Sequence, residues 1–395
     1  MTLKNDQLLT KEFILLSFSS LLFFSSFNMI IPELPNYLTS LGGAEYKGYI
    51  ISLFTLTAAF SRPFSGKLTD SIGRVPIMIF GASVAFIVGI SYPLFTSVAG
   101  FLFLRLIHGF STGFKPTGTS AYIADIVPEN RRGEAMGILG VATSLGMALG
   151  PTIGTKVAST FGYDILFYSS GSIALLSIII LFNLKETLDN KKRKPFSFKL
   201  LKISKDDFFE PRVIAPAIVF LFSTFSFGLI LTIIPDLSES IGINDKGIYF
   251  TIFVLSSILI RFIAGKASDL HGRIPVIVAS MVLLIVSMLL LTFVQTPTTF
   301  YLSAFVYGIS LGMSSPTVFA WTADLANPKQ IGRAFATIYI ALEVGIGIGA
   351  FVSAKIYANN PEFFGFTFAS GAITALFALI YSYSKFKTKH RNSRL

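Results

Sequence analysis

The sequence predicts an all-α membrane protein with twelve transmembrane helices in two six-helix bundles. The chain of 395 residues is 52% hydrophobic and 13% charged, with a mean hydropathy of +0.69, which is more apolar than a soluble core of this size requires. Twelve apolar stretches are each long enough to cross roughly 30 Å of hydrocarbon as a helix. One charged motif also occurs twice, half a chain apart.

The predicted spans fall into two sets of six, separated by a polar segment. In chain order they are 13–38, 48–69, 75–95, 98–126, 133–159 and 163–184, then 213–240, 247–269, 274–294, 299–325, 331–358 and 363–385. The first span follows lysines and resembles a signal peptide at first sight. It is longer than such a segment, and it holds Pro32, Glu33 and Pro35 where a small-residue cleavage site belongs, so we interpret it as the first helix.

The basic residues indicate how the chain is oriented. Most of the 32 Lys and Arg lie in alternate loops, on the side that also holds both termini, whereas Lys47, Lys156, Lys246 and Lys355 are expected near the outer helix ends. The positive-inside rule therefore places both termini in the cytoplasm. This distribution explains the net charge of +11 without a nucleic-acid partner. The chain has no cysteine, which excludes disulfides and thiolate metal sites.

The two sets of six helices are related by an internal repeat. Residues 66–76, GKLTDSIGRVP, recur as residues 265–275, GKASDLHGRIP, and further matches keep the same offset of 199 positions. We predict an N-terminal bundle (1–184), a basic cytoplasmic linker (185–212) with an interfacial helix near 196–203, and a C-terminal bundle with a cytoplasmic tail (213–395).

The repeated motif supplies a tight turn and an acid at a helix end. Gly66 and Gly73 permit the turn and close helix contact. A carboxylate is unfavourable at the carboxyl end of its own helix but favourable at the start of a neighbouring one. By the repeat symmetry, Asp70 is expected to face the start of the eleventh span near Gly332, and Asp269 the start of the fifth near Gly133.

Two arginines complete the motif. Arg74 and Arg273 are expected to pair with Asp125 and Asp324, which end the fourth and tenth spans on the same side. The alternative is that these charges only orient the loops.

The motif identifies a known family. The stretch GKLTDSIGRVP resembles the signature loop of the major facilitator superfamily, Gly-x-Leu-x-Asp-x-x-Gly-Arg, and the twelve-helix plan covers the whole chain. The resemblance implies two six-helix bundles around a central cavity that opens alternately to each side. It also implies that the motif latches the cytoplasmic side in the outward-facing state.

The fifth span carries a glycine pattern. Gly137, Gly146, Gly150, Pro151 and Gly154 resemble the signature of exporters that work as antiporters in this superfamily. Glycines four apart form a groove that another helix can enter, and a proline bends the helix. Generic small-residue packing is the alternative.

Several ionisable residues lie within predicted spans, where they are costly and usually functional. RLIHGFSTG, 105–113, resembles a third family motif, with His108 in place of a glutamine, and the family assigns the arginine equivalent to Arg105 a role near proton transfer. Glu33 lies at a similar depth, and a change in its distance from Arg105 would load or release a proton. Alternatively Glu33 is an acid at the headgroup level, and the same holds for its counterpart Asp236. His108 is expected to hydrogen-bond beside Arg105.

Two charges fall near the middle of their spans. Lys115 and Glu343 are too deep to reach an interface easily. They are expected to pair with each other, to serve the substrate, or to do both in turn, and a purely structural pair is the alternative.

The leading hypothesis is a proton-coupled exporter of a small organic molecule, and the alternative is an importer or facilitator of a sugar or organic anion. An ATP-driven pump or membrane enzyme is disfavoured because the chain has no Gly-x4-Gly-Lys-Ser/Thr run. We therefore expect no catalytic activity, cofactor or metal. The expected partners are a small-molecule substrate, protons and the lipid bilayer of a bacterial inner membrane, with the protein as a monomer. The charge of the substrate stays open.

Overall fold

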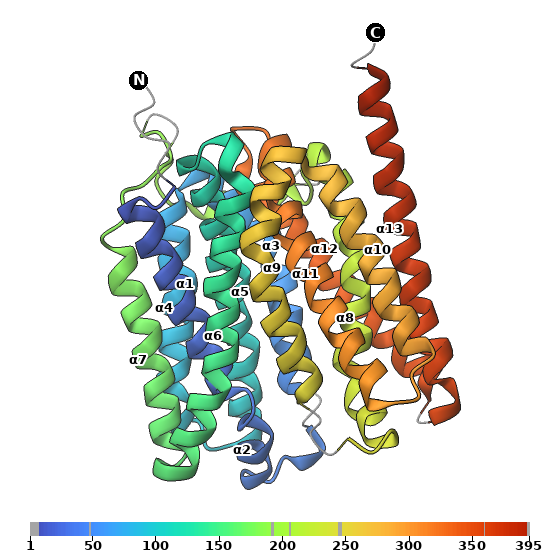
Figure 1. The fold of residues 1–395 in the computed structure, drawn as a ribbon. Helices are drawn as coiled ribbons and strands as arrows, with labels where there is room; N and C mark the ends of the chain where they lie inside the picture. The colour runs from blue at the N-terminus through green and yellow to red at the C-terminus, as the bar shows by residue number, and fades with distance from the viewer. Residues whose placement is uncertain are drawn as a thin grey trace. The chain divides into compact units, whose positions relative to one another are not determined.

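The computed structural model describes residues 8–46, 49–190, 193–204, 207–243, 247–358 and 360–392. Lys47 and Lys246, two of the residues expected at outer helix ends, lie outside these ranges. All regular elements within the described ranges are helices (Figure 1). The predicted all-α fold class is confirmed.

Each predicted span except the first coincides with one long helix, and the first coincides with two. In the first half these are α1 (Lys11–Ile30) with α2 (Leu34–Ser40), α3 (Tyr49–Ser71), α4 (Arg74–Ser91), α5 (Val98–Ile126), α6 (Arg132–Phe161) and α7 (Tyr163–Leu181). In the second half they are α8 (Ile214–Ser240), α9 (Ile248–His271), α10 (Arg273–Thr292), α11 (Pro297–Leu325), α12 (Ile331–Tyr357) and α13 (Phe364–Asn392). The two lists correspond helix by helix, as the repeat predicts.

The first predicted span is divided in the structure. α1 ends at Ile30 and α2 begins at Leu34, whereas the sequence analysis expected one helix over 13–38. Pro32 and Pro35 cause the break, because proline has no N–H to donate and disfavours helical geometry in the residue before it. The second half has a single proline at the matching place, Pro235, and α8 continues through it.

Ten helices of the described chain are long and apolar enough to span a membrane. α3 and α5 are not among them, because each carries several polar and charged residues, including Arg62 in α3 and Arg105 and Lys115 in α5. Arg105 and Lys115 are both buried within the protein. These two charged side chains of α5 therefore contact other parts of the protein and not the lipid.

The chain forms two compact units. Unit 1 comprises residues 1–128, 139–210 and 326–339, and unit 2 comprises residues 129–138, 211–325 and 340–395. The first turns of α6 therefore pack in unit 2, and those of α12 pack in unit 1. The domain boundaries expected from the sequence, at 184 and 212, stay a prediction.

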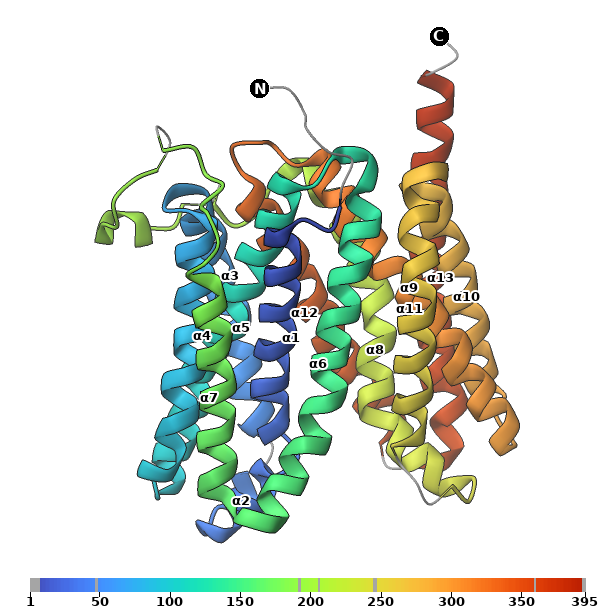
Figure 2. The same ribbon diagram turned by 60° about the vertical axis from the view of Figure 1, so that its left-hand side comes forward.

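Inside the units the helix packing repeats. In unit 1, α3 and α4 pack on α5, while α7 packs on α1 and α4, as Figures 1 and 2 show. In unit 2, α9 and α10 pack on α11, while α13 packs on α8 and α10. Each pair in the second set is the repeat equivalent of a pair in the first, so the sequence repeat corresponds to a repeated packing scheme.

The linker differs from its predicted form. Where an interfacial helix was expected near 196–203, the structure has a single 3₁₀ turn, η4 (Phe198–Leu201). Pro195 precedes this segment and two lysines interrupt its apolar residues, which leaves too few periodic residues for an α-helix. The linker up to Glu210 belongs to unit 1.

Candidate functional site

The first candidate site is a charged cluster at the end of α3, here called the first motif cluster and comprising Asp70, Arg74 and Asp125 with the start of α12. The Asp70 carboxylate accepts hydrogen bonds from the backbone N–H groups of Gly332 (2.7 Å) and Arg333 (2.9 Å). Arg74 Nε donates to Asp125 Oδ2 at 2.9 Å, and Arg74 Nη1 donates to the Thr69 carbonyl at 2.8 Å. An acid of the first half thus satisfies the free N–H groups at a helix start of the second half.

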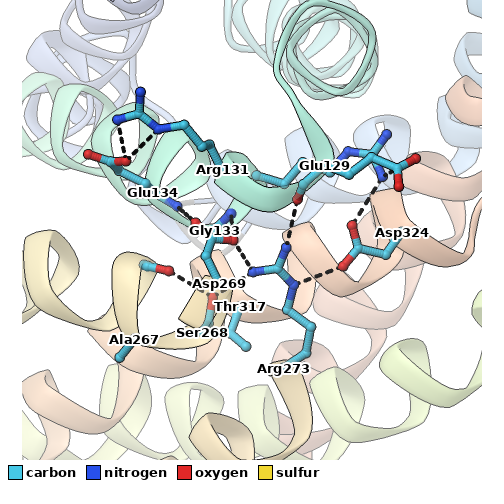
Figure 3. Close-up of polar contacts among 12 residues, drawn as sticks. Glu129, Arg131, Gly133, Glu134, Ala267, Ser268, Asp269, Arg273, Thr317 and Asp324 are labelled. Carbon is cyan, nitrogen blue, oxygen red and sulfur yellow. Dashed lines mark hydrogen bonds and ion pairs between the residues drawn. The ribbon is translucent and has the colours of Figure 1, made fainter. Parts of the chain in front are cut away.

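The second motif cluster comprises Asp269, Arg273 and Asp324 with the start of α6 (Figure 3). Asp269 accepts hydrogen bonds from the N–H groups of Gly133 and Glu134, both at 2.9 Å. Arg273 Nε donates to Asp324 Oδ2 at 2.8 Å, and Nη1 contacts Asp269 and Ser268. These are the contacts that the repeat symmetry predicts.

Glycines allow the helices of each cluster to approach closely. A Cβ on Gly66 would lie 2.8 Å from Ala336 Cβ and 3.0 Å from Arg333 Cα. A Cβ on Gly265 would lie 2.6 Å from the Gly133 carbonyl oxygen and 2.9 Å from Glu134 Cα. Without glycine at these positions, the helix starts of α12 and α6 would be pushed away from Asp70 and Asp269.

Two acidic residues of the linker contribute contacts that the sequence analysis did not single out. The Glu186 carboxylate accepts from the N–H groups of Arg74 and Val75, each at 3.0 Å, and so caps α4. Asp207 pairs with Lys67 at 2.8 Å and with Arg333 at 3.0 Å. Burial raises the pKa of Asp207, but the hydrogen bonds from Lys67 and Ser204 outweigh burial and lower this pKa to about 2. Its carboxylate is therefore charged throughout the physiological pH range.

A second candidate site is a buried polar group in unit 1 around Arg105. Arg105 Nε donates to the Ile50 carbonyl at 2.9 Å, and Nη1 donates to the Tyr92 hydroxyl at 3.3 Å. The Tyr92 hydroxyl also lies 3.2 Å from His108 Nδ1, as expected for a hydrogen-bonding histidine beside Arg105. The guanidinium lies over the Phe54 ring, 4.7 Å from its centroid. In the described part of the chain, Arg105 makes no ion pair with Glu33, so the pair considered from the sequence is not formed in this structure.

Lys115 is a buried cation of the same unit. Its Nζ lies 3.4 Å from the Ser19 carbonyl oxygen and 4.8 Å from the Phe23 ring centroid, and the side chain is 1% exposed. Lys115 belongs to unit 1 and Glu343 to unit 2, so their expected pairing stays a prediction.

The candidate acids differ in exposure. Glu33 is half-buried at the start of α2, where its side chain makes no capping hydrogen bond. Asp236 is exposed on α8 beside Tyr357, and Glu343 is half-buried on α12. No group of three His, Asp or Glu side chains suited to a metal ion occurs among the described residues.

The glycine pattern of α6 faces α1. A Cβ on Gly146 would lie 2.5 Å from the Leu21 carbonyl oxygen, and one on Gly150 would lie 2.7 Å from that of Ser25. Gly154 meets the Met29 backbone in the same way. Gly137 is different, because its Cβ would lie 2.8 Å from the Arg261 carbonyl oxygen of α9. The groove therefore holds α1 over three successive turns, and Pro151 lies inside α6 between two of them.

Long apolar helices in two repeated sets, joined by charged motifs at their ends, define an integral membrane transporter. The chain belongs to the Major Facilitator Superfamily, whose family model matches residues 16–227 and 216–394.

Two similar proteins are bacterial proteins of multidrug resistance. The chain is 27% identical to the multi-drug resistance efflux pump PmrA of Streptococcus pneumoniae serotype 4, over 94% of this chain and 95% of the relative. It is 26% identical to the multidrug resistance protein MdtG of Escherichia fergusonii, over 92% of each chain.

Solved structures share the fold. The human organic anion transporter MFSD10 (TETRAN) has a TM-score of 0.78 and 20% identity, and covers 94% of this chain and 98% of its own. The proton:xylose symporter XylE also has a TM-score of 0.78, with 15% identity and 94% of each chain covered. At these identities the likeness establishes the fold alone.

Proposed function

We propose that this protein is a proton-coupled exporter of small organic molecules that works by alternating access. The observation that carries the proposal is the pair of motif clusters, in which Asp70 holds the start of α12 and Asp269 holds the start of α6. Each contact joins the two halves of the sequence through hydrogen bonds that form and break without covalent change. Such contacts suit a protein that interconverts between two arrangements.

Two features support export. The glycine pattern of α6 resembles that of antiporting exporters, and it packs on the carbonyl oxygens of Leu21 and Ser25 in α1. Of the relatives named above, PmrA is an efflux pump and MdtG is a multidrug resistance protein. We infer from these features that the substrate leaves the cell, and that the motif clusters act as latches on the cytoplasmic side.

Glu33 is the proposed proton carrier. It lies where α1 breaks before α2, half-buried and without a capping bond from its side chain. An ionisable group within a membrane-spanning region is costly and usually functional. Asp236 and Glu343 are the alternatives in the second half. Arg105, His108 and Lys115 supply buried polar groups in unit 1.

The proposed setting is a bacterial inner membrane with both termini, the linker and both motif clusters in the cytoplasm. In this orientation the basic linker lies on the same side as the positively charged loops. The protein needs only the proton gradient and a substrate, and it works as a monomer.

The test is proton movement in everted membrane vesicles energised to an acidic interior. Two panels of compounds, lipophilic cations and anionic or zwitterionic metabolites, are added to vesicles with the parent protein, Glu33→Gln or Glu45→Gln. Glu45 is an exposed acid of the following loop and serves as the matched control. We expect some compound to release protons with the parent and with Glu45→Gln, but not with Glu33→Gln.

The other outcomes are informative. Release that survives Glu33→Gln would move coupling to Asp236 or Glu343. Substrate uptake into these vesicles without proton release across both panels would contradict proton coupling and favour a facilitator. The panel that responds identifies the charge of the substrate.

A further inference from the structure

The repeat relating the two motif clusters is broken at one charged position. Lys67 and Lys266 occupy equivalent positions, as do Asp70 and Asp269. The residue after the repeated helix-start glycine, Gly133 or Gly332, differs in charge, however. It is Glu134 at the start of α6 and Arg333 at the start of α12.

In the second motif cluster, Glu134 supplies negative charge at the start of α6. Its carboxylate pairs with Arg131 at 2.7 Å and with Lys266 at 3.5 Å. An acid in the first turn of a helix is also favourable to the helix dipole. Lys266 is thus balanced by an acid that belongs to the helix it approaches.

The first motif cluster has a cation in the corresponding place. With Arg333 in the first turn of α12, Lys67 meets a second positive charge, which is unfavourable both as a pair and for the helix dipole. The start of α12 nevertheless contacts Asp70, because the Gly332 N–H donates a hydrogen bond to the Asp70 carboxylate at 2.7 Å.

Asp207 of the linker contacts both cations. Its Oδ2 lies 2.8 Å from Lys67 Nζ, and its Oδ1 lies 3.0 Å from Arg333 Nη2. Ser204 donates to the same carboxylate from its N–H at 2.9 Å and from its hydroxyl at 2.8 Å. The Asp207 side chain is only 6% exposed.

The linker is attached to both helices around this point. Lys67 Nζ also donates to the Lys202 carbonyl at 2.8 Å, and the Glu210 N–H donates to Thr337 of α12 at 3.0 Å. Lys202 and Glu210 of the linker therefore contact the end of α3 and the start of α12, respectively.

We propose that Asp207 is a positioning residue of the transport cycle, which supplies from the linker the negative charge that Glu134 supplies in the second motif cluster. The linker then forms part of the first motif cluster. Asp207 must separate from Lys67 or from Arg333 whenever that cluster opens. This inference rests on the proposed function, because it assigns Asp207 to the latch of the transport cycle.

The test uses a cysteine reporter, since the chain has no cysteine of its own. Ser120 is 1% exposed, and its hydroxyl lies 3.1 Å from the hydroxyl of Tyr339 in α12. The alkylation rate of Ser120→Cys in lipid nanodiscs therefore reports how often the start of α12 leaves α5. It is measured in the parent reporter and with Asp207→Asn, Asp207→Glu, Lys67→Met/Asp207→Asn, and Asp189→Asn. Asp189 is an exposed linker acid and is the matched control.

We expect Asp207→Asn to raise the alkylation rate about tenfold, equivalent to roughly 1.4 kcal/mol. Asp207→Glu and Asp189→Asn stay within about twofold of the parent, because both keep the charge balance of the cluster. Lys67→Met in the Asp207→Asn background lowers the rate again, because the facing cation is gone. The ratio between Asp207→Asn and the parent is the same at pH 6 and pH 8, since a carboxyl with a pKa of about 2 is ionised at both.

Two results would overturn the inference. One is a folded Asp207→Asn protein that is alkylated at the parent rate, and the other is a Lys67→Met/Asp207→Asn protein as fast as Asp207→Asn. If Asp207→Asn does not fold, the Lys67→Met/Asp207→Asn variant decides. An alkylation rate equal to that of the parent supports the charge-balance argument, and a faster rate contradicts it. No substrate or proton gradient is used, so failure of the antiport assay and failure of this inference are separate results.

Discussion

At the scale of single residues, the repeated glycines have a conformational reason. Gly73 has φ 135° and ψ 165°, and Gly272 has φ 89° and ψ 160°, a region that is essentially restricted to glycine. Each glycine sits directly before the arginine that begins α4 or α10. The backbone can therefore turn from one helix into the next while the arginine stays beside its acids.

Replacing these two glycines by alanine tests this interpretation. We expect each of Gly73→Ala and Gly272→Ala to destabilise the protein by about 1–3 kcal/mol, because alanine strains the backbone there. Gly73→Ala has the larger effect, because its Cβ would also meet the Glu186 carboxylate, whereas that of Gly272 would meet only Pro275 Cδ at 3.9 Å. Thermal unfolding in detergent measures both, and equal stability of Gly73→Ala and the parent would contradict the backbone argument.

At the scale of helices, the contact between α6 and α1 depends on small residues. Between helices in a membrane the hydrophobic effect contributes little, so close packing decides affinity. The glycines at 146 and 150 let α6 approach the α1 backbone, and Gly345 and Gly349 of α12 do the same for α8. The second half keeps this contact without a proline in α12, so the glycines rather than Pro151 make the groove.

A matched pair of alanine substitutions tests the groove. Gly150→Ala places a Cβ 2.7 Å from the Ser25 carbonyl oxygen and 3.1 Å from Asn28 Cβ, so α1 must shift at a cost of about 1–3 kcal/mol. Gly347 of α12 has nothing within 4 Å of its would-be Cβ, and Gly347→Ala is expected to be neutral or to stabilise α12 by up to about 1 kcal/mol. Thermal unfolding and export are measured for both. Similar results for the two variants would remove the special role of the groove.

At the scale of the whole molecule, the two motif clusters use one design twice. Each cluster joins an acid at the end of one helix to the start of a helix from the other half of the sequence. The clusters differ in the source of their balancing acid, which is Glu134 within α6 in one case and Asp207 in the linker in the other.

Weakening either cluster should slow transport. Asp70→Asn and Asp269→Asn each remove the charge that attracts two N–H groups, so we expect turnover in reconstituted vesicles to fall several-fold while substrate binding persists. The double variant is expected to be slower than either single variant. Glu129→Gln is the matched control, because its side chain is 87% exposed. Unchanged turnover in both single variants would contradict the latch proposal.

Much of this architecture follows from the sequence by itself. Helix length and apolarity predict the helical elements, since the hydrocarbon thickness sets how many residues a helix needs to cross it, and ten of the described helices meet both criteria. The offset of 199 positions relates the helices and pairs Asp70 with the start of α12, because a repeated spacing implies a repeated packing. Regular elements have periodic signals, which predict the fold, and the repeat predicts the helix starts that Asp70 and Asp269 contact.

Other contacts were decided only by the tertiary structure. The sequence did not indicate that Arg105 bonds to Ile50 and Tyr92 rather than to Glu33, because a long side chain reaches partners on any neighbouring helix. Nor did it single out Asp207, because an irregular linker has no periodicity from which its path can be read. The sequence did contain one indication, because Glu134 in the first half corresponds to Arg333 in the second half. The first motif cluster therefore lacks an acid at that position. Which acid supplies the missing charge depends on where the chain folds back in space, and that is a property of the folded protein alone.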